Sequence, residues 1–443
     1  MTYEPLREVP PAAGWGKGDV LVLFGELFGR GYANGIVDEA RRAGMTVVGA
    51  TVGRREPDGT LRPLTPDELS QAEANLGGRI VNVPLEAGFD LEPAAGGGPS
   101  PAEQLKGARP EAWQSFALDW ALVESAREAG VRRFEQNLAA FVAALEDLVP
   151  AGANVLFVHT MAGGFPRARV YMPLLTRIFR GTGEKYLPSD GFWASDLGRL
   201  WAVSFDEVTG RTFERLVAAT AALREGGRRV RYLAYGYHGC EVLVRGAYTW
   251  QTYVPYLQGW AKLLLERCAS DAWARGVRCT VFNSPEIWSN SSAIFLGVEV
   301  ALYPLLAALE KEAPGSAATE AARARCGAAL KAGATIEALL ARAEAFLGDP
   351  ARGAFRDFAT WPHHTRRDEL EAMLAASSDL LAMSADPKAP VVAELSPFVF
   401  QAVGRLMFDE AWEPSRPVRW LNHDVVAKRL GAGVGAAAGP RSA

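Results

Sequence analysis

The feature that most constrains the fold is a regular alternation of short apolar segments with helix-like segments between about residues 18 and 310. The apolar segments, which we expect to be strands, are residues 19–24, 45–52, 79–85, 154–160, 229–237 and 278–284. They are continuous apolar runs, which is typical of strands covered on both faces. Helices are expected between them, at 32–44, 132–149 and 256–276. This order predicts an α/β fold with a doubly wound parallel sheet.

Two changes of composition predict the domain organisation. Residues 165–212 are rich in aromatic residues and glycine, and we interpret them as an insertion near the ligand within a domain of residues 1–312. The following sequence is alanine-rich with helical periodicity, which predicts a C-terminal helical region at 313–430. The glycine- and alanine-rich residues 431–443 are expected to be a disordered tail.

The overall charge and composition exclude several classes of protein. A formal net charge of −4 argues against nucleic acid as a partner. The N-terminal residues are acidic and proline-rich, unlike a signal peptide, and no apolar run approaches the roughly 20 residues of a membrane span. The four cysteines lack CxxC spacing and are interpreted as reduced structural thiols. These features predict a cytoplasmic protein without a membrane partner; a homo-oligomer is left open.

A glycine turn follows the first expected strand directly. Gly25, Gly29 and Gly31 have GxxxGxG spacing, and the next helix starts at Tyr32. Such glycines let the backbone approach a pyrophosphate, which then lies at the helix N-terminus. The turn therefore predicts a Rossmann-like dinucleotide site, and the alternative is a glycine-rich turn without a ligand.

The end of the second expected strand bears on the choice of cofactor. It runs from Thr51 to Arg54 and Arg55. An acidic residue at this place suits the ribose hydroxyls of NAD, whereas arginine suits a 2′-phosphate. The two arginines favour NADPH over NADH, unless they are only a solvated basic pair.

Small residues follow the fourth expected strand. Thr160, Ala162 and Gly163 leave room for a ribose and a nicotinamide, and we predict that they contact the cofactor. His159 is interpreted as a structural histidine rather than a ligand. The pair His363–His364 has no partner at metal-ligand spacing, so no metal site is predicted.

The segment QTYVPYLQGWAK, residues 251–262, combines two tyrosines with a lysine. Tyr253 precedes Lys262 with eight residues between them, and Tyr256 precedes it with five. In a reductase of this architecture a lysine holds the nicotinamide ribose, and a phenol donates a hydrogen bond to the substrate oxygen that gains negative charge. We predict these roles for Lys262 and Tyr253, with Tyr237 at the end of the fifth strand as a second donor. The alternative is that both tyrosines of the segment only pack.

In this order, the glycine turn, the small residues and the Tyr-x8-Lys pair resemble the short-chain dehydrogenase/reductase superfamily. The eight-residue gap is similar to that of FabV-type trans-2-enoyl-thioester reductases, and the chain as a whole resembles the FabMG-type enoyl-acyl carrier protein reductases. Residues 283–294, NSPEIWSNSSAI, resemble the family loop that contacts nicotinamide and substrate. This resemblance implies that Pro285 contacts the cofactor, and that Tyr256, Ser291 and Ser292 contact the substrate.

The resemblance also implies a reaction. A hydride from NADPH or NADH would pass to the β-carbon of a 2-enoyl thioester carried by coenzyme A or acyl carrier protein, as in fatty acid synthesis. The first alternative is a carbonyl reductase, which would use the same residues on a 3-oxoacyl or alcohol-forming substrate. The second is a dinucleotide-binding protein without turnover.

Overall fold

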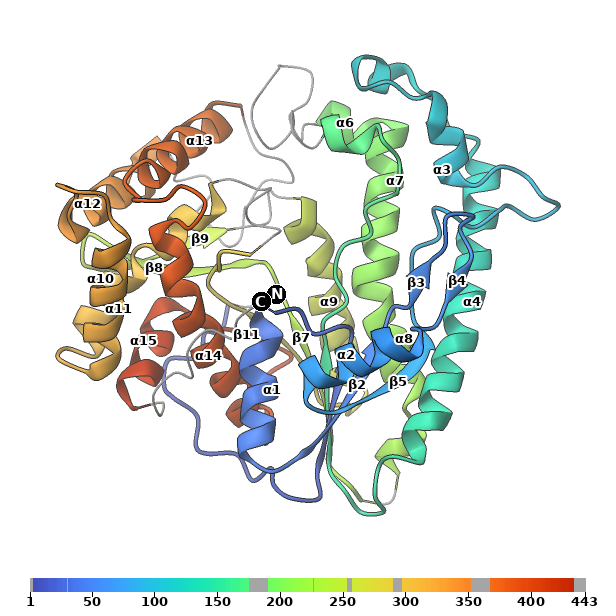
Figure 1. Ribbon diagram of the computed structural model, residues 1–443, viewed down its shortest axis with the longest axis horizontal. Coiled ribbons are helices and arrows are strands. Elements are labelled where there is room, and N and C mark those ends of the chain that lie inside the picture. Colours follow the sequence, from blue (N-terminus) through green and yellow to red (C-terminus); the bar gives the residue numbers. More distant parts are fainter. Residues whose placement is uncertain are drawn as a thin grey trace.

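The computed structural model describes residues 3–29, 31–174, 190–225, 227–252, 257–289, 297–351 and 367–433. Within them lies a seven-stranded parallel sheet in the order β11-β10-β7-β6-β1-β2-β5 (Figure 1). Its strands are β1 (Val20–Phe24), β2 (Thr46–Thr51), β5 (Arg79–Pro84), β6 (Val155–His159), β7 (Val230–Tyr235), β10 (Cys279–Asn283) and β11 (Val418–Trp420). The chain winds outward from β1 in both directions, so the strand order reverses between β1 and β6. The prediction of a doubly wound, Rossmann-like sheet is confirmed.

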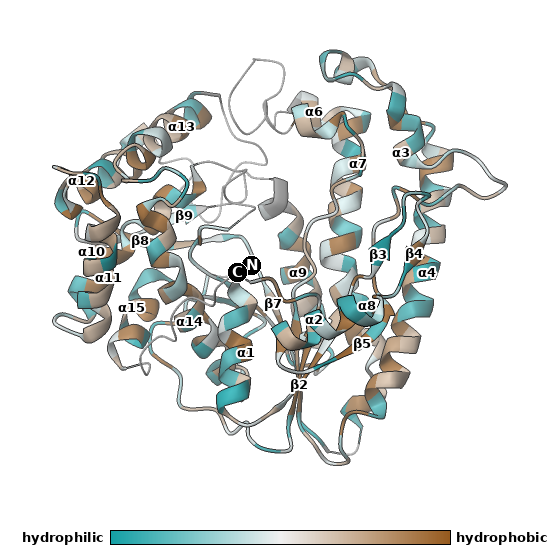
Figure 2. Cartoon of the chain, viewed as in Figure 1, coloured by the Kyte–Doolittle hydropathy of each residue, from teal (hydrophilic) through white to brown (hydrophobic). Residues whose placement is uncertain are grey.

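Helices cover both faces of the sheet, as the continuous apolar strands predict. Leu21 and Leu23 point to the face covered by α1 (Tyr32–Arg42), α14 (Val391–Glu410) and α15 (His423–Gly431). Val20 and Val22 point to the opposite face, which is covered by α4 (Trp120–Glu146), α8 (Thr212–Ala219) and α9 (Leu257–Ala274). Figure 2 shows hydrophobic strands at the centre and helices of mixed hydropathy around them. The core therefore has two layers, with the sheet between them.

Helices α1 and α14 cross with almost no space between their backbones. A Cβ atom on Gly35 would overlap the carbonyl oxygen of Phe400, and one on Gly404 would overlap the backbone of Gly35. By length and composition α14 is the one helix in the described ranges that could cross a membrane, but 67% of its apolar window is buried inside the protein. Its apolar character is therefore accounted for by packing against α1 and the sheet.

The remaining elements surround this core. Two antiparallel hairpins are β3 (Arg54–Arg55) with β4 (Leu61–Arg62), and β8 (Gly239–Val244) with β9 (Ala247–Thr252). The helices are α2 (Pro66–Leu76), α3 (Pro101–Gln104), α6 (Asp190–Ala194), α7 (Asp196–Phe205), a π-helix (Asp206–Arg211), α10 (Leu305–Glu312), α11 (Ala317–Ala329), α12 (Ile336–Leu347) and α13 (Arg367–Leu381). Short 3-10 turns lie at Leu105–Gly107, Pro110–Ser115, Ala222–Arg224 and Val298–Leu302.

The structure differs from the sequence prediction in two elements. Helix α4 begins at Trp120 rather than near residue 132, because the Asp119 carboxylate accepts hydrogen bonds from the first free N–H groups of the helix. The β8–β9 hairpin was not expected; its turn is formed by Arg245 and Gly246, both with positive φ.

The region after residue 312 is largely helical, and it also contributes β11 to the sheet. The division of the chain at residue 312 therefore stays a prediction. Of the expected tail, residues 434–443 lie outside the described residues.

Candidate active site

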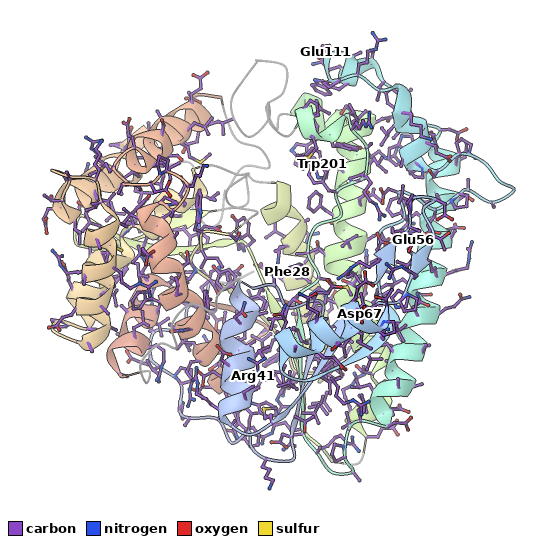
Figure 3. All side chains as sticks on the ribbon, viewed as in Figure 1. Phe28, Arg41, Glu56, Asp67, Glu111 and Trp201 are labelled. Atoms are coloured by element: carbon purple, nitrogen blue, oxygen red, sulfur yellow. The ribbon has the colours of Figure 1, made fainter. Side chains whose placement is uncertain are left out.

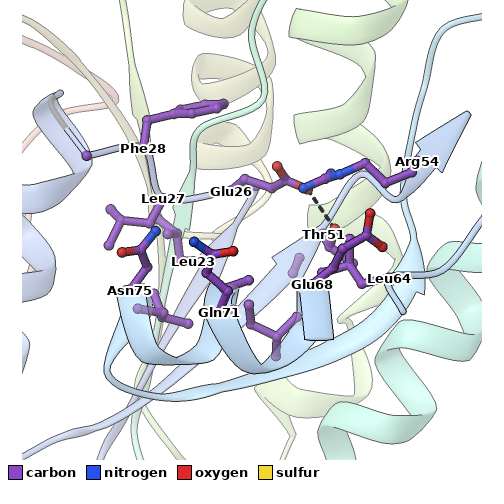
Figure 4. A pocket seen from close by; sticks show the side chains of 17 residues that line it. Leu23, Glu26, Leu27, Phe28, Thr51, Arg54, Leu64, Glu68, Gln71 and Asn75 are labelled. Carbon is purple, nitrogen blue, oxygen red and sulfur yellow. Dashed lines mark hydrogen bonds and ion pairs between the residues drawn. The ribbon is translucent and has the colours of Figure 1, made fainter. Parts of the chain in front are cut away.

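A cavity of ≈ 450 Å³ lies at the carboxyl ends of the central strands. It extends from Gly25 after β1, past Arg54 and Arg55, to Thr160 and Ala162 after β6. This is the point at which the strand order reverses, where open α/β sheets bind their ligands. A second cavity of ≈ 300 Å³ lies between the glycine turn and α2 (Figure 4).

The glycine turn has the backbone geometry that a pyrophosphate site requires. Gly25 has a φ of 141°, and a Cβ atom there would overlap the Thr160 hydroxyl, so the turn needs glycine at this position. A Cβ atom on Gly29 or Gly31 would meet open space. Among the described residues no side chain caps the first turn of α1 at Gly31. The free N–H groups and the open space fit the diphosphate of a dinucleotide.

Glu26 is the acidic group of this turn. One of its carboxylate oxygens accepts hydrogen bonds from the Thr51 hydroxyl at 2.6 Å and the Val52 N–H at 3.3 Å. The same oxygen pairs with Arg54 at 2.8 Å (Figure 4). Arg54, which is predicted to favour a 2′-phosphate, is therefore held by a carboxylate.

Arg55 is also engaged by carboxylates. Its guanidinium pairs with Glu86 at 2.5 Å and with Glu92 at 2.8 Å. Glu86 pairs in addition with Arg167, which itself pairs with Asp90. The arginines of this end of the cavity are thus compensated within the protein.

Phe28 lies at the rim of both cavities. Its side chain, labelled in Figure 3, is 71% exposed, which is unusual for a large apolar residue. Across the larger cavity Phe165 packs on Trp201 at 4.4 Å between ring centroids. Trp201 is fully buried, as are Phe192 and Phe205, so these aromatic residues of the predicted insertion are core residues.

Lys262 lies on α9 beside the end of β7 and is not among the residues that line the two cavities. Its ammonium donates a hydrogen bond to the Tyr235 carbonyl at 2.6 Å. Burial lowers the pKa of Lys262 to about 8, and the carboxylate of Glu286 opposes this shift. The position one turn into the helix is the one predicted from the sequence.

Tyr237 and Glu286 form a pair next to this lysine. The Tyr237 hydroxyl donates a short hydrogen bond to a carboxylate oxygen of Glu286, whose other oxygen accepts from the Ile287 N–H at 3.1 Å. Burial raises the pKa of the Glu286 carboxyl to about 7, against the effect of these two donors. The Tyr237 phenol therefore bonds to a buried carboxyl, and that carboxyl interacts electrostatically with the Lys262 ammonium.

Tyr32 contacts the loop that follows β10 at Pro285. The Tyr32 hydroxyl donates a short hydrogen bond to the Pro285 carbonyl, and its ring stacks on Tyr235 at 5.4 Å between centroids. Burial raises the pKa of Tyr32, and the charge of Glu286 adds to this shift. The first residue of α1 therefore fixes the loop that follows β10.

The residues after β6 lie at the cavity as predicted for Thr160 and Ala162. The Gly163 carbonyl accepts a hydrogen bond from Thr209 at 3.1 Å. His159 is buried, its Nε2 lies 2.8 Å from the Thr212 hydroxyl, and burial lowers its pKa to about 3. This is the environment of a structural histidine.

Four residues predicted to act on the substrate lie outside the described residues. They are Tyr253, Tyr256, Ser291 and Ser292. The segment QTYVPYLQGWAK joins β9, which ends at Thr252, to α9, which begins at Leu257. Its described residues are the end of β9 and the start of α9, which carries Lys262.

Sequence reasoning missed two acidic residues, Glu26 and Glu286. Glu26 stands inside the glycine motif, where a small residue is more common, and that departure is the signal that could have found it. Glu286 follows Pro285 in a loop rich in serine and asparagine, and this pattern does not distinguish its carboxylate from a solvated one.

The fold, the glycine turn and the lysine define a dinucleotide-dependent reductase. A family model described as "Enoyl-acyl carrier protein reductase FabMG" matches residues 2–430. The chain therefore belongs to the FabMG family of enoyl-acyl carrier protein reductases, and the prediction of an NAD(P)H-dependent enoyl thioester reductase is confirmed.

Two solved structures resemble the chain over nearly its whole length. An apo structure of FabMG is 48% identical with a TM-score of 0.92, covering 97% of this chain and 98% of that one. An NADH-bound structure of FabMG is 41% identical with a TM-score of 0.78, covering 97% and 99%. No curated protein matches the chain. These comparisons support the enoyl reductase part of the resemblance and do not support placement in the short-chain dehydrogenase/reductase superfamily.

Proposed function

We propose that this chain reduces its enoyl thioester with NADH in preference to NADPH. The observation that carries this proposal is the position of Glu26 at the glycine turn, bonded to Thr51 and paired with Arg54. A carboxylate accepts hydrogen bonds from ribose hydroxyls and repels a 2′-phosphate. The NADH-bound FabMG structure, 41% identical, supports the same choice. The proposal reverses our sequence-based preference for NADPH, because Arg54 and Arg55 are both held by carboxylates.

The chain's own residues would then divide the work along the cleft. The N–H groups of the glycine turn and α1 bind the diphosphate, and Lys262 holds the nicotinamide ribose and adds positive charge. When bound, the nicotinamide supplies the hydride that passes to the β-carbon of the enoyl thioester. Tyr253 remains the predicted main donor to the thioester oxygen, with Tyr237 as the second. The family supports an acyl carrier protein thioester as the substrate; a homo-oligomer and a cytoplasmic location stay predictions.

The test is a comparison of kcat/KM for NADH and NADPH at a fixed concentration of a crotonyl thioester, on both coenzyme A and acyl carrier protein. We expect a preference for NADH of at least about ten-fold, since one unfavourable charge contact is worth about 1.4 kcal/mol or more. Equal use of the two cofactors, or a preference for NADPH, would contradict the role of Glu26. Reduction of acetoacetyl thioester but not of crotonyl thioester would contradict the enoyl assignment for this site.

A further inference from the structure

Glu286 lies behind the proposed donor Tyr237, in the loop that follows β10. Glu286 is only 5% exposed, and its carboxylate accepts hydrogen bonds from the Tyr237 hydroxyl and the Ile287 N–H. A buried carboxyl is costly unless it is paired and hydrogen-bonded. The carboxylate of Glu286 accepts from the hydroxyl of Tyr237, the residue proposed as second donor to the substrate oxygen. The carboxyl is therefore placed to act on that phenol.

The charged and titratable groups around Glu286 come from three packed elements. Lys262 on α9 contributes a positive charge, and Glu299 in the 3-10 turn Val298–Leu302 contributes a negative one. Tyr32 on α1 interacts with the carboxylate as well. Glu299 has its own donors, the Ser377 hydroxyl and the Gly297 N–H. Glu286 is therefore the carboxyl of this group that bonds to Tyr237.

The protonation state of Glu286 determines where the Tyr237 proton can point. An ionised carboxylate only accepts hydrogen bonds, so the Tyr237 hydroxyl must donate to it. A neutral carboxyl can donate to the Tyr237 oxygen instead, which leaves the phenol proton free to point to the substrate. The same carboxyl can then replace a proton that the phenol has lost.

We propose that Glu286 is a positioning residue that relays protons to Tyr237 during enoyl reduction. Hydride addition to the β-carbon leaves an enolate. The Tyr237 O–H bond breaks and its proton passes to the α-carbon of that enolate, which gives the saturated thioester and leaves a phenolate. The Glu286 carboxyl O–H bond then breaks and its proton passes to the phenolate oxygen, and the carboxylate regains a proton from solvent. One solvent proton is consumed per turnover, and no further oxidant or reductant is needed. This inference rests on the proposed role of Tyr237.

The test compares Glu286→Gln with a matched control, Glu299→Gln, in the full-length enzyme. Glu299 is also a buried carboxyl with a raised pKa, and its carboxylate accepts from the Ser377 hydroxyl and the Gly297 N–H. For each variant kcat is measured with NADH and crotonyl thioester from pH 5.5 to 9, and NADH binding is followed by fluorescence. We expect wild-type kcat to fall as Glu286 ionises above about pH 7. In Glu286→Gln we expect kcat about ten- to a hundred-fold lower at pH 6, without that fall, and NADH binding unchanged.

Other outcomes separate the relay from a structural role. A lowered kcat in Glu286→Gln that keeps the wild-type pH profile would overturn the relay, as would the same loss in Glu299→Gln. If Glu286→Gln does not fold, Glu286→Asp takes its place. Glu286→Asp keeps a carboxyl, so the fall in kcat with rising pH must persist, at a shifted pH. A pH profile identical to that of wild type overturns the proposal.

Tyr237→Phe distinguishes failure of the relay from failure of the proposed function. Wild-type kcat in Tyr237→Phe would remove the donor role of Tyr237 and the relay with it. A low kcat in Tyr237→Phe together with wild-type behaviour in Glu286→Gln would remove only the relay.

Discussion

We propose that the cavity beside the glycine turn holds the adenosine end of the cofactor and that Lys262 lies at its nicotinamide end; these two places treat charge in opposite ways. At the adenosine end, Arg54, Arg55 and Arg167 are each paired with carboxylates, and Arg54 and Arg167 keep 40% and 36% of their side chains exposed. At the nicotinamide end, Glu286 is buried and Lys262 is half-buried, and desolvation dominates the pKa of each. Solvated, paired charges contribute little to stability and suit recognition. Buried groups with pKa values near neutrality suit proton chemistry.

This contrast separates two kinds of mutational effect. Changes at the adenosine end should alter which cofactor binds, with modest changes in rate. Changes at the nicotinamide end should alter turnover and its pH dependence, because the groups there act on charge that develops during the reaction.

The largest effect is expected for Lys262→Met. Loss of the ammonium, which we propose holds the ribose and stabilises negative charge, should lower kcat/KM by about 10²–10³. Steady-state kinetics with NADH and crotonyl thioester measure it. The matched control is Lys311→Met, since Lys311 also donates to a backbone carbonyl, that of Gly246 at 3.2 Å, but on the surface. Equal losses in both variants would show that the effect is not specific to the cleft.

The next largest effect is expected for Tyr237→Phe, which should lower kcat by about 10–10² while NADH binding stays the same. Turnover at pH 6 and NADH fluorescence provide the two readouts. Tyr248→Phe is the control, because the Tyr248 hydroxyl also donates to a glutamate, Glu312 at 2.8 Å. Tyr248 lies in the β8–β9 hairpin and lines neither cavity. An unchanged kcat in Tyr237→Phe would leave Tyr253 as the principal donor.

A smaller effect is expected on stability, and its sign depends on pH. Burial raises the pKa of Glu286 from 4.5 to about 7, so the folded state holds a proton that the unfolded state has released between these pH values. The contribution of Glu286 to stability therefore falls as pH rises from about 4.5 to 7 and stays low above it. The free energy of unfolding of Glu286→Gln, relative to that of wild type, should therefore increase by on the order of 2 kcal/mol when the pH is raised from 5 to 8. Urea unfolding at the two pH values measures this, and an equal difference at both would contradict it.

The smallest effect is expected at the adenosine end. Glu26→Gln should shift the ratio of kcat/KM for NADPH to that for NADH by about ten-fold towards NADPH, since it removes one negative charge beside the ribose. Glu56→Gln is the control, because Glu56 pairs with Arg62 in the neighbouring hairpin and lines neither cavity. A ratio that moves equally in both variants would assign the effect to the overall charge of the surface.

The sequence allowed the central sheet to be predicted because its strands are buried on both faces. Continuous apolar runs such as VLVLF at residues 20–24 have one stable placement, between two layers of helices. Position along the chain then placed Gly25, Thr160 and Lys262 at the same edge of that sheet. These predictions depend on local pattern and on the rules of parallel sheets.

What could not be predicted depends on contacts between distant residues. From the sequence alone, Arg54 and Arg55 indicate a site for a phosphate group. In the structure they are paired with Glu26, Glu86 and Glu92, which lie elsewhere in the chain. Glu286 shows no sign of its altered pKa in the sequence, because the upward shift comes from burial in the folded protein and outweighs the opposing hydrogen bond from Tyr237, 49 positions earlier. β11 is only three residues long, and its strand pairing is set by β10 rather than by its own composition.

The crossing of α1 and α14 has a consequence for how this protein is made. Helix α1 follows the glycine turn, yet the backbone that covers it at Gly35 belongs to residues 400–404. A growing chain on the ribosome therefore lacks the surface against which α1 must pack until residues 400–404 have been added. Such distant contacts slow folding and prolong exposure of apolar surface. Helix α1 is made more than 350 residues before its partner on α14, so its apolar face stays uncovered during that interval of synthesis.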